Sequence, residues 1–172
     1  MKKFMAAIAA MNKMYKLPLT KIPTDFPNEP MLNRLAKFKK TLADEVDEID
    51  EIAGLVQSEA DPVDVITAKA DILGDVVVFC FSEAAKYGIP LDKVLEIIME
   101  SNASKLGSDG EPIYNEDGKF LKGPNYWKPE PRIRELLEVL RQEEQAVSEV
   151  TTCCAMPNGS MALLQFTTKT NT

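Results

Sequence analysis

The segment that decides the fold spans residues 61–88 and reads DPVDVITAKADILGDVVVFCFSEAAKYG. Asp61 followed by Pro62 is a helix start signal, and Gly88 marks a helix stop. Residues 76–81 have strand propensity, but the uninterrupted length between start and stop favours a single helix. Because this helix is apolar on nearly all sides, we expect it to lie buried at the centre of the fold.

Helical patterns flank this segment on both sides. Residues 3–15 predict a short helix, and Asn28 with Pro30 can begin a long one that extends to Val56. The long helix has one apolar stripe with steps of three and four residues: Leu35, Phe38, Leu42, Val46, Ile49, Ala53 and Val56.

The carboxyl-terminal half predicts two further helices, over residues 91–105 and 132–147. Between residues 107 and 131, two Asp-Gly dipeptides at 109–110 and 117–118 predict a small hairpin or ordered loop. The expected fold class is therefore all-α, a helical bundle of four to five helices with a small hairpin or ordered-loop insert.

Length and composition indicate one soluble domain. The chain has 172 residues, of which 45% are hydrophobic and 27% charged, and no stretch approaches the length of a membrane span. We expect the domain to cover residues 1–149 and residues 150–172 to form a poorly ordered tail. The three cysteines have no ligand-like spacing, and the basic and apolar start lacks a signal-peptide cleavage site, so the cytoplasm is favoured.

The charged and titratable residues exclude several functions. The chain has no histidine, which rules out a Ser-His-Asp triad, a Cys-His pair and a histidine-ligated zinc site. Its formal net charge of -7 disfavours a nucleic acid polymer as partner and favours a cation.

An acidic run lies on the predicted long helix, where six of the residues 44–51 are Asp or Glu. Such a run is commonly a solvated surface. At roughly 100° per residue, however, Glu45 and Glu48 point in neighbouring directions and Glu45 lies beside the apolar stripe, whereas Asp44, Asp47 and Glu51 point farther away.

A second acidic pair, Asp71 and Asp75, shares one face of the apolar segment 61–88. Unpaired buried carboxylates are costly, so this pair needs a counter-charge. Two interpretations stay open: Lys69 or Lys86 pairs with the aspartates, or a divalent cation lies between them and Glu45 and Glu48. Oxygen ligands alone favour Mg²⁺, Mn²⁺ or Ca²⁺.

The motifs Glu45-Val-Asp-Glu48 and Asp71-Ile-Leu-Gly-Asp75 resemble the paired acidic motifs of the all-α nucleotide pyrophosphohydrolases. This group includes MazG-like enzymes, dimeric dUTPases and phosphoribosyl-ATP pyrophosphohydrolase. The residues from Ser101-Asn102 through Lys122-Gly123-Pro124-Asn125-Tyr126 are similar to a compact MazG-like subtype of phages and integron cassettes. One departure is that such families have Glu-x-x-Asp on the second helix, where Ile72 replaces the first carboxylate and Asp71 precedes it.

The resemblance implies roles for particular residues. It implies that Glu45, Glu48 and Asp75, with Asp71 as a substitute, hold Mg²⁺ or Mn²⁺ against a triphosphate, and that Glu45 or Glu48 orients or deprotonates the attacking water. The implied substrate contacts are Asn12, Asn102, Lys105, Lys122 and Tyr126. Asn102 and Lys105 have an alternative as a helix-end cap and a cation at a helix carboxyl terminus.

The implied activity is Mg²⁺-dependent hydrolysis of ordinary or damaged deoxynucleoside triphosphates to a monophosphate and pyrophosphate. The resemblance also implies a homodimer or homotetramer that acts in nucleotide-pool house-cleaning, without a nucleic acid polymer or a membrane as partner. Two alternatives remain, a catalytically silent helical interaction protein and a phosphoribosyl-ATP pyrophosphohydrolase.

Overall fold

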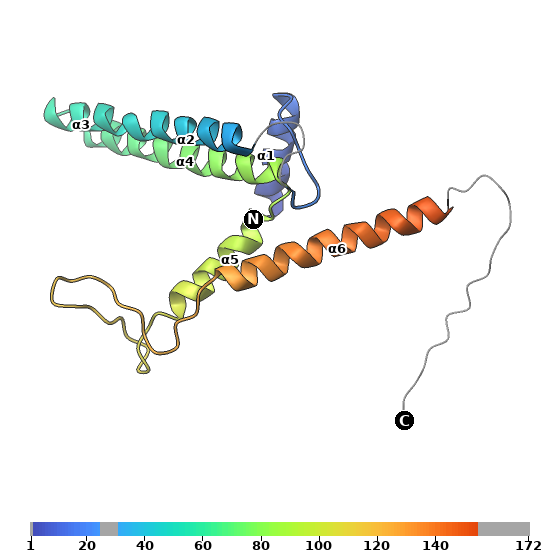
Figure 1. The fold of residues 1–172 in the computed structure, drawn as a ribbon. Helices are drawn as coiled ribbons and strands as arrows, with labels where there is room; N and C mark the ends of the chain where they lie inside the picture. Colours follow the sequence, from blue (N-terminus) through green and yellow to red (C-terminus); the bar gives the residue numbers. More distant parts are fainter. Residues whose placement is uncertain (1, 25–30, 155–172) are drawn as a thin grey trace.

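The computed structural model of the chain describes residues 2–24 and 31–154. Its helices in chain order are α1 (Lys2–Met14), α2 (Met31–Asp47), α3 (Ile49–Gln57), α4 (Pro62–Lys86), α5 (Leu91–Ala103) and α6 (Glu130–Cys154) (Figure 1). Within the described residues, strand pairing is limited to one isolated antiparallel bridge between Tyr114 and Phe120. The all-α prediction is confirmed.

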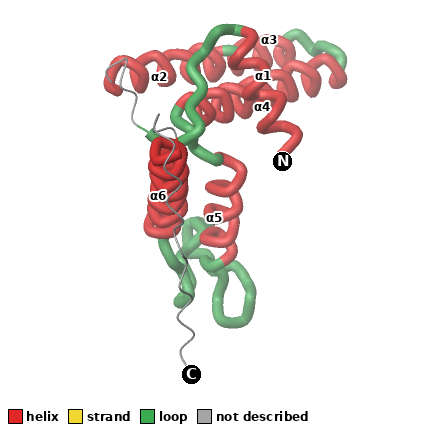
Figure 2. The backbone as a smooth tube through the Cα atoms, turned by 90° about the vertical axis from the view of Figure 1, so that its right-hand side faces the viewer, coloured by secondary structure: helices red, strands yellow, loops and turns green. Residues whose placement is uncertain are grey.

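Helix α4 is the central element of the arrangement. Helices α1, α2 and α3 all pack on α4, and α2 and α3 follow each other along its length in Figure 1. Helix α5 starts from the carboxyl end of α4 and carries α6 against it. Figure 2 shows α5 and α6 projecting from the layer that α1 to α4 form.

The start and stop signals of α4 act as the sequence predicts. The Val63 N–H donates to the Asp61 side chain at 2.8 Å, with Pro62 as the first helical residue. The helix ends at Lys86, and Gly88 follows with a φ of +68°, packed so closely on the backbone of Ile22 that a Cβ atom would collide with it. Residues 76–81 are helical throughout.

The predicted long helix is two helices, because α2 ends at Asp47 and α3 begins at Ile49. Glu48 between them keeps helical angles, with φ of -64° and ψ of -16°. Like charges three or four residues apart destabilise a helix, and this junction lies inside the acidic run 44–51. The predicted start of this helix at Asn28 and Pro30 lies outside the described residues.

The prediction that α4 is buried on nearly all sides is wrong for the single chain. Within the described residues the buried hydrophobic side chains are Ile8, Ile72, Phe81, Ala84, Tyr87 and Val94. By contrast, α4 leaves four large apolar side chains between 45% and 67% exposed: Val63, Ile66, Leu73 and Val77. Their spacing of three, seven and four residues places them on one face of the helix, so α4 is covered on one side only.

The segment 104–129 is an ordered loop that folds back on the end of α5. The Ser101 hydroxyl donates to the Trp127 carbonyl at 2.8 Å, and the Gly123 N–H donates to the Lys105 carbonyl at 2.8 Å. A Cβ at Gly123 would overlap the Leu106 carbonyl, so only glycine allows this close approach.

Helix α6 continues to Cys154, past the end predicted at 147 and into the first residues of the predicted tail. The rest of that tail, 155–172, lies outside the described residues. Across the described part of the chain, every helix is too short or too polar for a membrane span.

Candidate functional site

The four predicted metal ligands come from facing helices. Glu45 lies near the end of α2, Glu48 at the junction with α3, and Asp71 and Asp75 on α4, against which both helices pack. Burial raises the pKa of the Glu45 carboxyl, and the negative charges of Glu48, Asp75, Asp44 and Asp71 raise it further. The other three predicted ligands therefore lie within electrostatic reach of Glu45.

The oxygen that makes this group unusual is Glu45 Oε2, which is buried without a hydrogen-bond partner. Buried carboxylate oxygens normally have a donor or a cation beside them. The other three carboxylates, those of Glu48, Asp71 and Asp75, are exposed. The expectation that Asp71 and Asp75 are buried is therefore wrong, since only the α2 side of the group is shielded from water.

Among the described residues, no lysine forms an ion pair with Asp71 or Asp75. Lys86, one of the two predicted partners, instead binds Glu83 at 2.8 Å. Neither Asp71 nor Asp75 takes part in an ion pair with a described residue. Of the two interpretations of the aspartate pair, pairing with Lys86 is wrong.

The donor set fits a hard divalent cation in charge and chemistry, because it consists of carboxylate oxygens and includes one buried oxygen without a donor. Among the described residues, however, no three acidic, histidine or cysteine side chains are close enough to hold one ion together. The side chains of Glu45, Glu48, Asp71 and Asp75 would have to converge to bind it.

The predicted substrate contacts at the end of α5 form a second group. The Lys105 ammonium donates to Asn102 Oδ1 at 2.6 Å, and the Lys122 ammonium lies 4.4 Å from the centre of the Tyr126 ring. Trp127 stacks on a different cation, with its ring 3.8 Å from the Arg132 guanidinium carbon. The loop 104–129 thus brings two pairs of predicted contact residues to one end of the molecule.

The carboxylates and the α5 group are not brought together within one chain. Asp75 lies roughly 16 Å back along α4 from its carboxyl end, and Asn102 lies roughly 16 Å along α5 from its start. Figures 1 and 2 both show α5 leading away from the layer of α1 to α4. The sequence predicted these residues as one site, and the fold separates them.

Asn12 is fully buried, at 0% exposure, and joins α1 to α4. Its side-chain amide donates to the Ser82 carbonyl at 3.0 Å, and the Ser82 hydroxyl donates to Asn12 Oδ1 at 2.6 Å. Both ends of the Asn12 amide are therefore engaged within the protein. Its predicted substrate contact stays a prediction.

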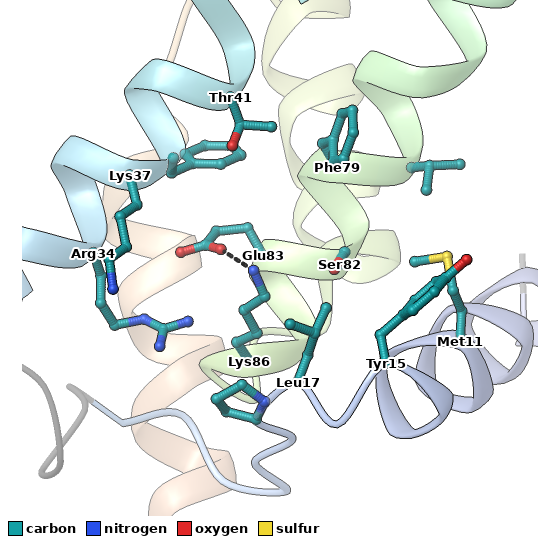
Figure 3. Close-up of a pocket in the computed structure, with 13 residues that line it drawn as sticks. Met11, Tyr15, Leu17, Arg34, Lys37, Thr41, Phe79, Ser82, Glu83 and Lys86 are labelled. Atoms are coloured by element: carbon teal, nitrogen blue, oxygen red, sulfur yellow. Dashed lines mark hydrogen bonds and ion pairs between the residues drawn. The ribbon is translucent and has the colours of Figure 1, made fainter.

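A pocket of about 690 Å³ opens between α1, α2 and α4 (Figure 3). Its lining is Met11, Tyr15, Leu17, Pro18, Arg34, Lys37, Phe38, Thr41, Val78, Phe79, Ser82, Glu83 and Lys86. The walls are mainly apolar and aromatic, and the polar groups include three cations. The cations are Arg34, Lys37 and Lys86, and Lys86 forms an ion pair at 2.8 Å with Glu83, the acidic residue of the lining.

The sequence analysis missed this pocket, although a signal was present. On α2, Arg34, Lys37 and Thr41 repeat at helical spacing on the face that continues to Glu45. The facing stripe on α4 consists of Asp75, Phe79, Ser82 and Lys86. The pocket and the carboxylates therefore occupy neighbouring stretches of the same two helix faces.

Comparisons with known proteins add little to this geometry. No protein-family model and no curated protein matches the sequence. Among solved structures, a protein of Exiguobacterium sp. 255-15 provisionally described as an NTP pyrophosphohydrolase is similar, with a TM-score of 0.43 and 24% identity, over 83% of this chain and 97% of that one. At this TM-score the similarity carries no weight for function, so function is inferred from this chain's own residues.

Proposed function

We propose that the chain is a Mg²⁺-dependent pyrophosphohydrolase that converts ordinary or damaged deoxynucleoside triphosphates to a monophosphate and pyrophosphate. The observation that carries the proposal is the group of facing carboxylates on α2 to α4, with Glu45 Oε2 buried and without a donor. The motifs from Glu45 to Glu48 and from Asp71 to Asp75, which resemble those of the all-α pyrophosphohydrolases, support the same activity.

The chemistry divides between the cation and the protein. A bound divalent cation supplies neutralisation of phosphate charge. Glu45 or Glu48 orients or deprotonates the attacking water. Cleavage between the α- and β-phosphates leaves the two terminal phosphates together as pyrophosphate.

The product decides between this proposal and other phosphatase reactions. Phosphorus NMR of the purified chain with Mg²⁺ and a panel of nucleoside triphosphates should detect monophosphate and pyrophosphate in equal amounts. Nucleoside diphosphates should react slowly, since they lack a pyrophosphate leaving group. Release of orthophosphate together with a nucleoside diphosphate would overturn the assignment.

A catalytically silent interaction protein is the second candidate. The observations that favour it are the exposed apolar face of α4 and the spacing of the acidic side chains, of which no three described ones are close enough for one ion. Calorimetric titration separates the two. If neither Mg²⁺ nor Mn²⁺ binds, even with a non-hydrolysable triphosphate present, the interaction protein replaces the enzyme.

A further inference from the structure

The pocket between α1, α2 and α4 continues directly into the carboxylate group. On α2, Thr41 at the pocket wall lies one helical turn before Glu45, roughly 6 Å along the axis. On α4, Phe79 lies one turn after Asp75. A ligand that reaches from the carboxylates along these two faces therefore enters the pocket.

The pocket chemistry selects a flat, aromatic group with hydrogen-bond acceptors. Figure 3 places the rings of Tyr15 and Phe79 on the wall of the cavity, with Arg34 and Lys37 on the opposite helix. Aromatic rings stack on nucleobases, and guanidinium and ammonium groups offer only donors. The volume of about 690 Å³ lies within the range of small-molecule sites.

The phosphate groups fit the pocket less well than the base does. The apolar side chains of Met11, Leu17, Phe38 and Val78 suit an uncharged base, whereas a phosphate would find donors only on the cationic part of the lining. The acidic group one turn away offers the place for a phosphate-bound cation. The two ends of a nucleotide thus match the two ends of the combined site.

We propose that this pocket binds the nucleoside end of the substrate, with the base against Tyr15 and Phe79 and with Arg34 and Lys37 donating hydrogen bonds to it. The inference rests on the proposed pyrophosphohydrolase function and adds the specificity-determining residues. Tyr15 and Lys37 lie at the exposed rim, so replacing them leaves the interior packing intact.

The test measures binding of the four deoxynucleoside monophosphates and of pyrophosphate, each without divalent cations, in the full-length chain. At least one monophosphate should bind. Tyr15→Ala should raise the Kd of that monophosphate about tenfold or more, because stacking on the ring is lost. Lys37→Gln should also raise it. The matched controls are Tyr114→Ala, an exposed tyrosine in the loop 104–129, and Lys39→Gln on the outer side of α2, and neither should change the Kd.

The outcomes distinguish a failure of the pocket assignment from a failure of the enzyme assignment. If pyrophosphate is released but Tyr15→Ala and Lys37→Gln keep the wild-type KM, the pocket assignment fails and the enzyme assignment stands. If monophosphate binding responds to the pocket variants while no triphosphate is hydrolysed, the pocket stands and the enzyme assignment fails. Binding of pyrophosphate alone, weakened by Lys37→Gln, would overturn the inference by placing phosphates in the pocket.

Discussion

Glu45 is the residue at which burial and charge act together. Burial first, and then the carboxylates of Glu48 and Asp75, raise its pKa above the ordinary value of 4.5. A carboxyl whose pKa is higher in the folded than in the unfolded protein is destabilising when ionised. This destabilisation is absent below pH 4.5 and is fully present once the pH exceeds the raised pKa.

A glutamine at position 45 should therefore stabilise the metal-free protein. We expect Glu45→Gln to raise the melting temperature at pH 7, and this gain should shrink as the pH falls towards 4.5. Thermal denaturation in EDTA across that pH range measures the effect. Glu51→Gln, an exposed glutamate on α3, is the control and should show no such pH-dependent gain. An equal gain for Glu45→Gln at both ends of the range would contradict the prediction.

Cation binding should offset the repulsion that the carboxylates of Glu48, Asp71 and Asp75 exert on Glu45. Mg²⁺ or Mn²⁺ should raise the melting temperature of the wild-type chain, because a ligand that binds only the folded state stabilises it.

Glu48→Gln should lower turnover by about 10²–10⁴-fold, the range for loss of a general base, while the variant stays folded. Full activity of Glu48→Gln, with Glu51→Gln as the reference, would remove Glu48 from the site.

At the level of the elements, α1 is attached to α4 by the reciprocal hydrogen bonds of Asn12 and Ser82. The rings of Phe4 and Phe81 add an edge-to-face contact with centroids 5.0 Å apart. Since α1 also forms one wall of the pocket, through Met11 and Tyr15, its attachment positions that wall.

Removing the Asn12 side chain should loosen this attachment. We expect Asn12→Ala to lower the free energy of unfolding by about 1–3 kcal/mol, because the buried Ser82 hydroxyl loses its partner. Denaturant unfolding measures it, and Asn33→Ala on the exposed side of α2 is the control. A purely structural Asn12 changes stability alone, whereas the predicted substrate contact would also raise KM in the folded variant. Unchanged stability would contradict the structural role.

At the level of the whole molecule, the exposed apolar face of α4 has no cover within the described chain. Val63, Ile66, Leu73 and Val77 follow a spacing of three and four residues, with Ala70 between them, as helices that pair along a seam do. Exposed apolar faces of this kind mark association sites.

We therefore propose that two or more copies associate through this face of α4. Sedimentation velocity at micromolar concentration should show a homodimer or homotetramer, and Leu73→Glu should shift it towards the monomer, because a charge would be buried in the interface. Leu121→Glu in the loop 104–129, also an exposed leucine, is the control. A wild-type monomer would contradict the proposal.

The features that local signals control could be predicted from the sequence. The cap at Asp61 and the stop at Gly88 act within one turn of the helix end, so α4 was predicted to within a few residues. The spacing of Asp71 and Asp75 is likewise a local property, and both lie on α4 as predicted. The break after Asp47 instead places Glu48 between α2 and α3, and not on one helix with Glu45. The end predicted for α6 was wrong, because its pattern weakens after residue 147 while the helix continues to Cys154.

Only the tertiary structure decided which helix faces meet. The facing of α2 and α4 aligns Arg34 and Lys37 with Phe79 to form the pocket. The direction of α5 leads its carboxyl end, which carries Asn102, away from the layer of α1 to α4 (Figure 1). The packing of α1, α2 and α3 on α4 also leaves Leu73 exposed, although α4 is apolar on nearly all sides. The physical reason is range: capping and helical spacing act over about four residues, whereas packing depends on contacts between side chains that are distant along the chain.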